Sequence, residues 1–182
     1  MKKTLAILLF LFTVTASGSA LAHGKHAHGK HVHGDAEMNV VLQDGELLIE
    51  IQGALASFIG FEHRPQNTQQ AAAADRLQAL MKDADRIFEL TPEAGCAVET
   101  VVLESPVFDK KKASGATTKK QDEHHDLSAQ YLFSCKNPAR LKSITVRLFT
   151  LFEGMHSIRV QAIHEGRQMA AGLSRERPTL SF

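Results

Sequence analysis

The chain has 182 residues, of which 43% are hydrophobic and 23% are charged, and 21 lysine and arginine residues against 20 aspartate and glutamate residues leave a net charge of +1. This balance excludes a generally basic nucleic-acid-binding protein and a strongly acidic solvating chain. The length fits one domain, or one domain with a tail. The unusual feature is histidine: five of the 10 histidines lie within residues 23–33.

Residues 1–22 have the features of a cleaved signal peptide. Two lysines precede an apolar run, residues 5–14, and residues 20–22 read Ala-Leu-Ala, which supplies small side chains where a signal peptidase reads them. The alternative is an N-terminal membrane anchor, but the run is too short to span about 30 Å of hydrocarbon comfortably. We therefore expect an exported protein that starts at His23 and does not span a membrane after processing.

Residues 23–34 are expected to form a histidine-rich tail, because they have no apolar periodicity and contain the repeat Lys-His-x-His-Gly twice. Side chains two residues apart project from the same side of an extended chain, so each His-x-His pair can bind one ion. Neutral imidazole suits Zn²⁺, Cu²⁺ and Ni²⁺, and one pair supplies half of a tetrahedral zinc site. The alternative is a solvated polar linker. The candidate ligands in the tail are His23, His26, His28, His31 and His33.

A β-hairpin is predicted next, with strands at residues 39–42 and 47–51. Asp44-Gly45 between these apolar runs is a strong turn signal. Apolar side chains alternate along the second strand, so one face should be buried. The residues expected on that face are Leu47, Ile49 and Ile51.

A helix is predicted from about Thr68 to Lys82, because Asn67 can cap its start and Pro65 disfavours helix just before it. Its expected apolar stripe consists of Leu77, Leu80, Met81, Ala84 and Phe88. His63, in the segment before the helix, is a further candidate metal ligand. A single histidine, however, is more often a surface or hydrogen-bonded residue.

Residues 109–126 read as a long polar loop of lysine, serine, threonine, glycine and acidic residues. His124 and His125 lie near its end among acids, which attract cations, and Asp126 adds oxygen ligands. The alternative is an ordinary solvated loop. Further strands are predicted over residues 97–103, 129–135, 144–152, 158–163 and 168–173, with Glu165-Gly166 as a second hairpin turn.

The fold class that follows is α+β, with antiparallel strands and hairpins packed against one main helix, a histidine-rich N-terminal tail and a long polar loop. Residues 35–182 are expected to form a single zinc-binding domain. Cys96 and Cys135 are the two cysteines, and in an exported chain we expect them to pair, which stabilises by about 4 kcal/mol through loop entropy. The alternative is a pair of thiolates on a metal.

Several short motifs occur in a distinctive order along the chain. They are His33-Gly34-x-Ala36, Gly60-Phe61-Glu62-His63, Ala94-Gly95-Cys96, the acidic-histidine loop before Tyr131-x-Phe133-x-Cys135, and Leu148-Phe149-x-x-Phe152. The chain resembles the ZrgA-like family of periplasmic zinc-uptake proteins over essentially the whole sequence after the leader. The resemblance implies an accessory protein that binds zinc in the bacterial periplasm and assists its import. It implies as zinc ligands the tail histidines, His63 and the loop histidines.

The leading functional hypothesis is therefore capture of Zn²⁺ and its transfer to a partner, either an inner-membrane zinc transporter or its binding protein, with no role for nucleic acid. The second is a periplasmic buffer or resistance protein for zinc, copper or nickel. The types of ligand do not distinguish among these three metals. The third is a zinc-dependent hydrolase with Glu62 or Glu123 as general base. The chain lacks the common zinc-protease, serine-hydrolase and deaminase motifs, so no catalytic residue is assigned. A fourth is a protein-interaction module with an incidental tail.

Overall fold

The computed structural model describes residues 33–108 and 126–182. Three features predicted from sequence therefore lie wholly or mostly outside the described residues: the signal peptide, the histidine-rich tail up to residue 32, and the polar loop up to residue 125 with its two histidines. The candidate ligands that fall there are His23, His26, His28, His31, His124 and His125.

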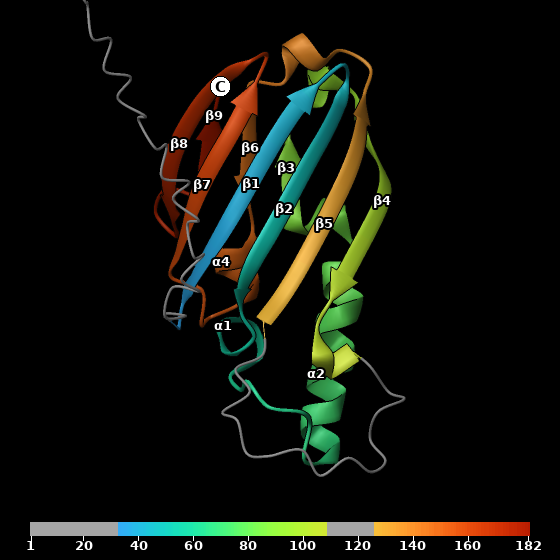
Figure 1. Ribbon diagram of the computed structural model, residues 1–182, viewed down its shortest axis with the longest axis vertical. Coiled ribbons are helices and arrows are strands. Elements are labelled where there is room, and N and C mark those ends of the chain that lie inside the picture. The colour runs from blue at the N-terminus through green and yellow to red at the C-terminus, as the bar shows by residue number, and fades with distance from the viewer. Residues whose placement is uncertain (1–32, 109–125) are drawn as a thin grey trace, which may run out of the picture.

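Within the described residues, six strands form the larger sheet, in the order β4-β5-β2-β1-β7-β8. Neighbouring strands are antiparallel except for β1 and β7, which run parallel. This is a correction to the expected antiparallel arrangement. The hairpins β1–β2 and β7–β8 are each antiparallel, and they join along β1 and β7 (Figure 1). The strands are β1 (Asp35–Gln43), β2 (Glu46–Ala54), β4 (Cys96–Glu104), β5 (Asp126–Cys135), β7 (Ser157–His164) and β8 (Arg167–Ser174).

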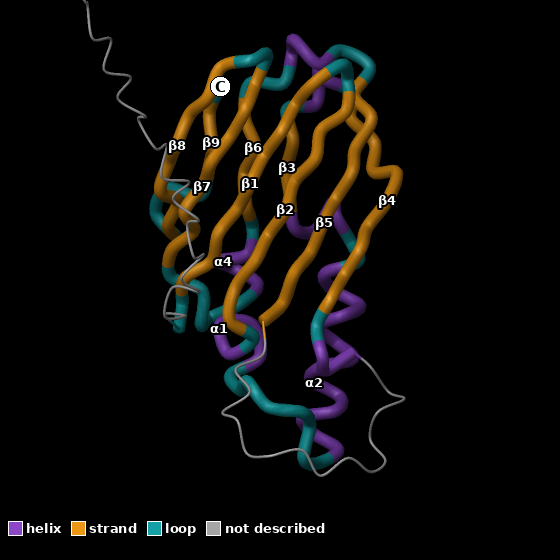
Figure 2. Tube along the Cα trace, in the orientation of Figure 1, coloured by secondary structure: helices purple, strands orange, loops and turns teal. Residues whose placement is uncertain are grey.

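A second layer lies on one side of this sheet (Figure 1). It holds a three-stranded sheet, in the order β3-β6-β9, and several short helices. Figure 2 shows the helical segments behind the larger sheet and at its two ends. The strands are β3 (Phe88–Leu90), β6 (Ser143–Val146) and β9 (Thr179–Ser181), the α-helices are α1 (Ala56–Ile59), α2 (Thr68–Met81), α3 (Ala84–Ile87) and α4 (Leu148–Leu151), and the 3₁₀ helices are η1 (Pro92–Ala94), η2 (Pro106–Phe108) and η4 (Pro138–Arg140).

Both predicted hairpin turns are confirmed. Asp44 and Gly45 connect β1 to β2 with φ angles of 52° and 88°, and Glu165 and Gly166 connect β7 to β8 with φ angles of 49° and 75°. Two successive residues with positive φ are typical of the turn whose twist matches that of the flanking strands. The alternation along β2 is also confirmed, since Leu47, Ile49 and Ile51 are buried.

The predicted helix is confirmed as α2, and the Asn67 side chain accepts a hydrogen bond from the Gln70 N–H at 2.9 Å. The expected apolar stripe was partly wrong, since Ala84 and Phe88 lie beyond this helix. The chain leaves the helix after Met81, and Phe88 lies in β3, because pairing with β6 overrides the helical spacing of its side chain. The strand predicted over residues 144–152 was partly wrong for a similar reason: β6 ends at Val146 and the short helix α4 follows.

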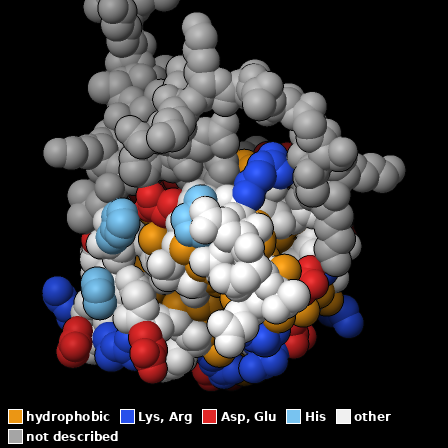
Figure 3. Space-filling model, turned by 90° about the horizontal axis from the view of Figure 1, so that it is seen from below, with side chains coloured by type: hydrophobic (Ala, Val, Ile, Leu, Met, Phe, Trp, Pro, Cys, Tyr) orange, Lys and Arg blue, Asp and Glu red, His pale blue; other side chains and the backbone are white. Residues whose placement is uncertain are grey.

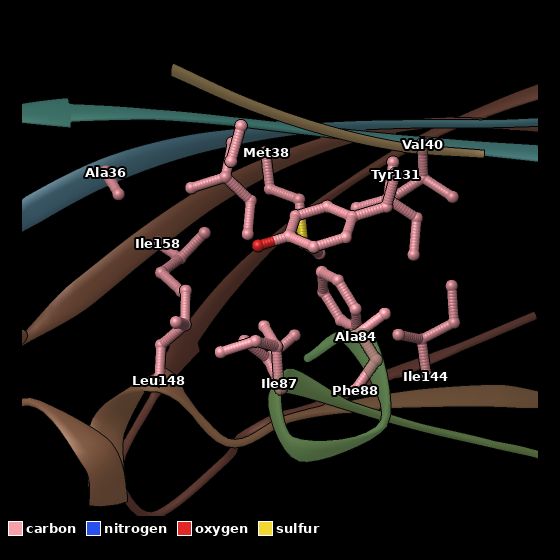
Figure 4. Packing of buried hydrophobic residues seen from close by; sticks show 14 of the residues in the cluster. Ala36, Met38, Val40, Ala84, Ile87, Phe88, Tyr131, Ile144, Leu148 and Ile158 are labelled. Carbon is pink, nitrogen blue, oxygen red and sulfur yellow. The ribbon is translucent and has the colours of Figure 1, made fainter. Parts of the chain in front are cut away.

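The hydrophobic core fills the space between the two layers. Figure 4 shows Met38, Val40 and Tyr131 from the larger sheet facing Ile87 and Phe88 from the opposite layer. All five are nearly or fully buried. The ring of Phe88 packs edge-on against that of Tyr131, with centroids 5.0 Å apart. The core therefore packs the larger sheet against the second layer.

The predicted disulfide is present between Cys96 and Cys135. It joins the first residue of β4 to the last residue of β5, which are paired in the sheet. Since the chain has two cysteines and both are in this bond, no thiolate remains for a metal. The alternative of a cysteine metal site is therefore wrong.

Candidate metal site

One end of the larger sheet gathers segments that are far apart in the sequence. Asp35, the first residue of β1, pairs with Ser157 at the start of β7, and Ala54, the last residue of β2, pairs with Asp126 at the start of β5. The last residue of β4 lies here too, because Glu104 pairs with Ser128 near the start of β5. We call this the junction end. The described residues begin here at residue 33. They stop at residue 108, soon after β4, and begin again here at residue 126 (Figure 1).

The base of the N-terminal tail is held firmly at the junction end. The Gly34 N–H donates a buried hydrogen bond of 2.9 Å to the Ser57 hydroxyl on α1. The Gly34 carbonyl accepts hydrogen bonds from the backbone N–H groups of His156 and Ser157, at 2.8 and 3.0 Å. Both polar backbone groups of Gly34 are therefore satisfied, which fixes the point where the tail meets the domain.

His33, the last histidine of the tail, contacts Glu62. Its Nε2 lies 3.2 Å from Glu62 Oε1, and the two side chains are 69% and 13% exposed. Glu62 reaches this position because Gly60 ends α1 in the left-handed conformation, with φ of 80°, and turns the chain outward. Figure 3 shows histidine and acidic side chains next to one another at this end of the molecule.

His63 is exposed, and one of its ring nitrogens contacts the backbone. Its Nδ1 lies 2.8 Å from the Arg64 carbonyl, which can only accept, so Nδ1 carries the proton and donates. Nε2 is then the nitrogen that can bind a metal. The ring also stacks on Phe61, with centroids 5.2 Å apart. These two contacts orient the ring of the candidate ligand.

The acidic residues around the tail base have different partners. Asp35 accepts a hydrogen bond of 2.7 Å from Ser157, and Arg159 lies 3.6 Å from its carboxylate. Arg159 also bonds Glu37 at 2.9 Å, and this bond is the main cause of the raised pKa of the guanidinium. Asp126, predicted as the last residue of the polar loop, instead begins β5.

The described residues contain no group of three or more histidine, cysteine, aspartate or glutamate side chains arranged to hold a metal ion. They bring His33 to Glu62 and place His63 and Asp126 at the same end. Sequence reasoning missed Glu62 as the partner of His33 and His156 as part of the tail base, because both contacts are between segments distant in sequence. His164 lies at the opposite end, buried and stacked on the ring of Phe182.

Residues 30–182 match the family described as ZrgA family zinc uptake protein. The chain belongs to the ZrgA family. Membership gives the protein a role in zinc uptake and places it in a family of uptake proteins, not of enzymes. No curated protein matches the chain significantly. Within residues 33–108 and 126–182, no helix is long and apolar enough to cross a membrane.

Proposed function

We propose that this protein is a periplasmic zinc carrier, which captures Zn²⁺ through its histidine-rich segments and passes it to a transport system of the inner membrane or to that system's binding protein. The chain would be processed after residue 22, carry its capture tail at residues 23–34, and fold over residues 35–182 as one domain with a loop at 109–126. Membership of a zinc-uptake family supports zinc as the ion that is carried.

One observation supports the mechanism most directly. The tail joins the fold and the polar loop leaves and returns at the same end, the junction end, where Glu62, His63 and Asp126 also lie. The tail and the loop carry seven of the histidines, counting His33. Ligands on the two segments can therefore meet over one small area. Zinc sites in proteins take four ligands, which neither a single His-x-His pair nor a lone histidine provides.

Capture and release both follow from this ligand set. Neutral imidazoles bind zinc strongly enough for scavenging, and ligands carried on segments outside the sheet can be replaced one at a time by those of a recipient. Binding must weaken in acid, because protonated imidazole cannot coordinate a metal. The proposed ligands are His23, His26, His28, His31, His33, His63, His124, His125 and Asp126.

Titration of the processed protein with Zn²⁺ in competition with a chromophoric chelator tests the proposal at about pH 7.5, where imidazole is neutral. We expect affinity far tighter than millimolar, and a steep loss of it as the pH is lowered through the imidazole range. A variant with alanine at the five tail histidines and at His124 and His125 should lose most of this affinity. Millimolar binding by the unmodified protein would contradict the proposal.

The alternative role in metal resistance makes the opposite prediction in cells. A deletion strain should grow poorly under zinc chelation if the protein assists uptake, and poorly in excess metal if it is a buffer. Zinc uptake is the role of the family, so we expect the first result.

A further inference from the structure

We propose that this protein forms a symmetric dimer, in which the edge strand β8 of each copy pairs antiparallel with β8 of the other. The proposal does not depend on zinc capture. β8 is the last strand of the larger sheet and pairs with β7 along one side. Figure 1 shows it at the margin of the sheet. A strand from a partner can add to such an edge through backbone hydrogen bonds.

Three residues of β8 direct their backbone polar groups away from β7. Pairs in an antiparallel ladder alternate between hydrogen-bonded and non-hydrogen-bonded, and the pair that closes a two-residue turn, here His164 with Arg167, is hydrogen-bonded. Counting from this pair, the N–H and C=O groups of Gln168, Ala170 and Gly172 point outward. In the part of the chain that the structure describes, these groups have no backbone partner.

The next residue in this alternation, Ser174, fits the same assignment. Its N–H donates to the Arg177 carbonyl and its carbonyl accepts from the Arg177 N–H, each at 3.1 Å. The chain therefore satisfies the outward groups at this end of the strand by itself. The stretch from Gln168 to Gly172 is left for a partner.

The two edges of the larger sheet differ in their protection. On β4, the pairing with β5 is interrupted between Val98 and Thr100, and Glu99 and Glu104 are exposed. Bulges and charges of this kind keep an edge strand from pairing with other chains. The pairing of β8 with β7 runs without interruption, and residues 168–173 contain neither a charged residue nor proline. β8 is therefore the edge open to pairing.

A second copy of β8 satisfies all the outward groups in one register. When Ala170 lies opposite Ala170 of the second copy, Gln168 of each copy lies opposite Gly172 of the other, and every outward N–H meets a carbonyl. A shift of two residues in either direction leaves Gln168 or Gly172 without a free partner. Nothing lies within 4 Å of a Cβ added at Gly172, so the Gln168 side chain of the second copy has room there.

Side chains favour the same register. Just beyond the strand ends, it places the exposed Glu165 opposite the exposed Arg175 of the second copy, whereas a shift of two residues opposes Arg167 and Arg175. On the inner face, Met169 lies opposite Ala171 of the second copy. Both are packed against the core of their own chain and only partly buried, so pairing joins the margins of the two cores.

The antiparallel pairing keeps the two junction ends apart. β8 ends at Ser174, which pairs with Ser157 at the junction end, and in the dimer this end lies beside the opposite end of the second copy. Each tail base therefore stays accessible. The two copies meet through backbone and side chains alone, so the dimer needs no metal.

Sedimentation equilibrium of the processed protein in excess chelator tests the dimer, and we expect a mass that rises with concentration to twice that of one chain. Ala170→Lys and Ala170→Glu should each weaken dimerisation about tenfold, because like charges then face each other across the axis. An equimolar mixture of the two should recover most of this loss. Val102→Lys is the matched control: Val102 is 42% exposed on the other edge strand, in the same row across the sheet, and its substitution should change nothing.

The register has a test of its own, which also decides if the charged variants do not fold. Opposed residues in a hydrogen-bonded pair have Cα atoms about 5.5 Å apart. A short thiol-specific cross-linker should therefore join Ala170→Cys chains into dimers and leave Val102→Cys chains unlinked. A monomer at all concentrations, a dimer that dissociates in chelator, or equal dimerisation of Ala170→Lys and Val102→Lys would each overturn this inference. None of these results would change the proposed capture of zinc.

Discussion

The hydroxyl of Ser57 accepts a hydrogen bond of 2.9 Å from the N–H of Gly34, 23 residues earlier in the chain. Both groups are buried, and Ser57 is 2% exposed. This bond ties the base of the tail to α1, and α1 leads directly into Glu62. The position of His33 relative to Glu62 therefore depends on a contact that involves neither residue.

Replacing Ser57 with alanine should lower the free energy of unfolding by about 1–3 kcal/mol, because the buried Gly34 N–H loses its acceptor. Chemical denaturation measures the effect. Ser134→Ala, on the exposed face of β5, is the control and should change stability by less than about 0.5 kcal/mol. Equal losses in the two variants would show that the bond contributes nothing specific.

Gly34 should not tolerate a side chain. Its φ is +92°, and an added Cβ would lie 2.4 Å from Cδ2 of the His156 ring. Gly34→Ala therefore adds a steric clash to the cost of about 1–2 kcal/mol for a left-handed alanine. We expect a lower melting temperature and weaker zinc binding, because the base of the tail must shift.

Gly166 provides a matched comparison for that substitution. Its φ is +75°, but nothing lies within 4 Å of an added Cβ. Gly166→Ala should show the backbone cost alone and leave zinc affinity unchanged. The difference in melting temperature between the two variants measures the clash with His156. Adding His156→Ala to Gly34→Ala should recover much of that difference. A Gly34→Ala variant as stable as Gly166→Ala would contradict the close packing.

Tyr131 should remain protonated in alkaline solution. It is fully buried, its hydroxyl donates to the Met81 carbonyl at 2.8 Å, and burial raises its pKa above the ordinary value of 10.0. It is the one tyrosine of a chain without tryptophan, so ultraviolet absorbance of tyrosinate reports it alone. The native protein should show no tyrosinate until well above pH 10 or until it unfolds.

The same shift predicts how stability depends on pH. The pKa of Tyr131 is higher in the native protein than in the unfolded chain, so the unfolded chain releases the proton first. The contribution of Tyr131 to the free energy of unfolding is therefore complete below pH 10, and it is lost as the pH rises from 10 toward the native pKa. Tyr131→Phe should cost about 1 kcal/mol at neutral pH through the lost hydrogen bond. Its stability should then fall less steeply above pH 10 than that of the unmodified protein. Parallel curves would contradict this assignment.

The disulfide should matter for stability and not for zinc. Cys96 and Cys135 are 39 residues apart, so removing the bond should cost about 4 kcal/mol by the entropy of the closed loop. The bond lies at the opposite end of the larger sheet from the junction end. The double alanine variant should unfold at lower denaturant concentration yet bind zinc normally at a temperature where it is folded. A loss of zinc affinity in folded protein would show that the two ends are coupled.

Much of the fold could be predicted because the determining signals are local. Asp44-Gly45 and Glu165-Gly166 specify their hairpins through the φ angles that these turns need, and Asn67 specifies the start of α2 through a hydrogen bond three residues ahead. The alternation of apolar residues in β2 identified its buried face. Where local spacing misled, as at Phe88, pairing with a distant strand outweighed it.

The amino-acid sequence by itself determined the chemical groups that this protein offers: clustered imidazoles of the kind that divalent metals prefer, two cysteines that can pair, and the motifs that indicate its family. Only the tertiary structure decided which distant segments of the described chain lie together. The parallel pairing of β1 with β7 and the antiparallel pairing of β2 with β5 bring the tail base and both ends of the loop to one end of the sheet. The contact between His33 and Glu62 follows from these pairings, which join residues too distant for any local pattern to reveal.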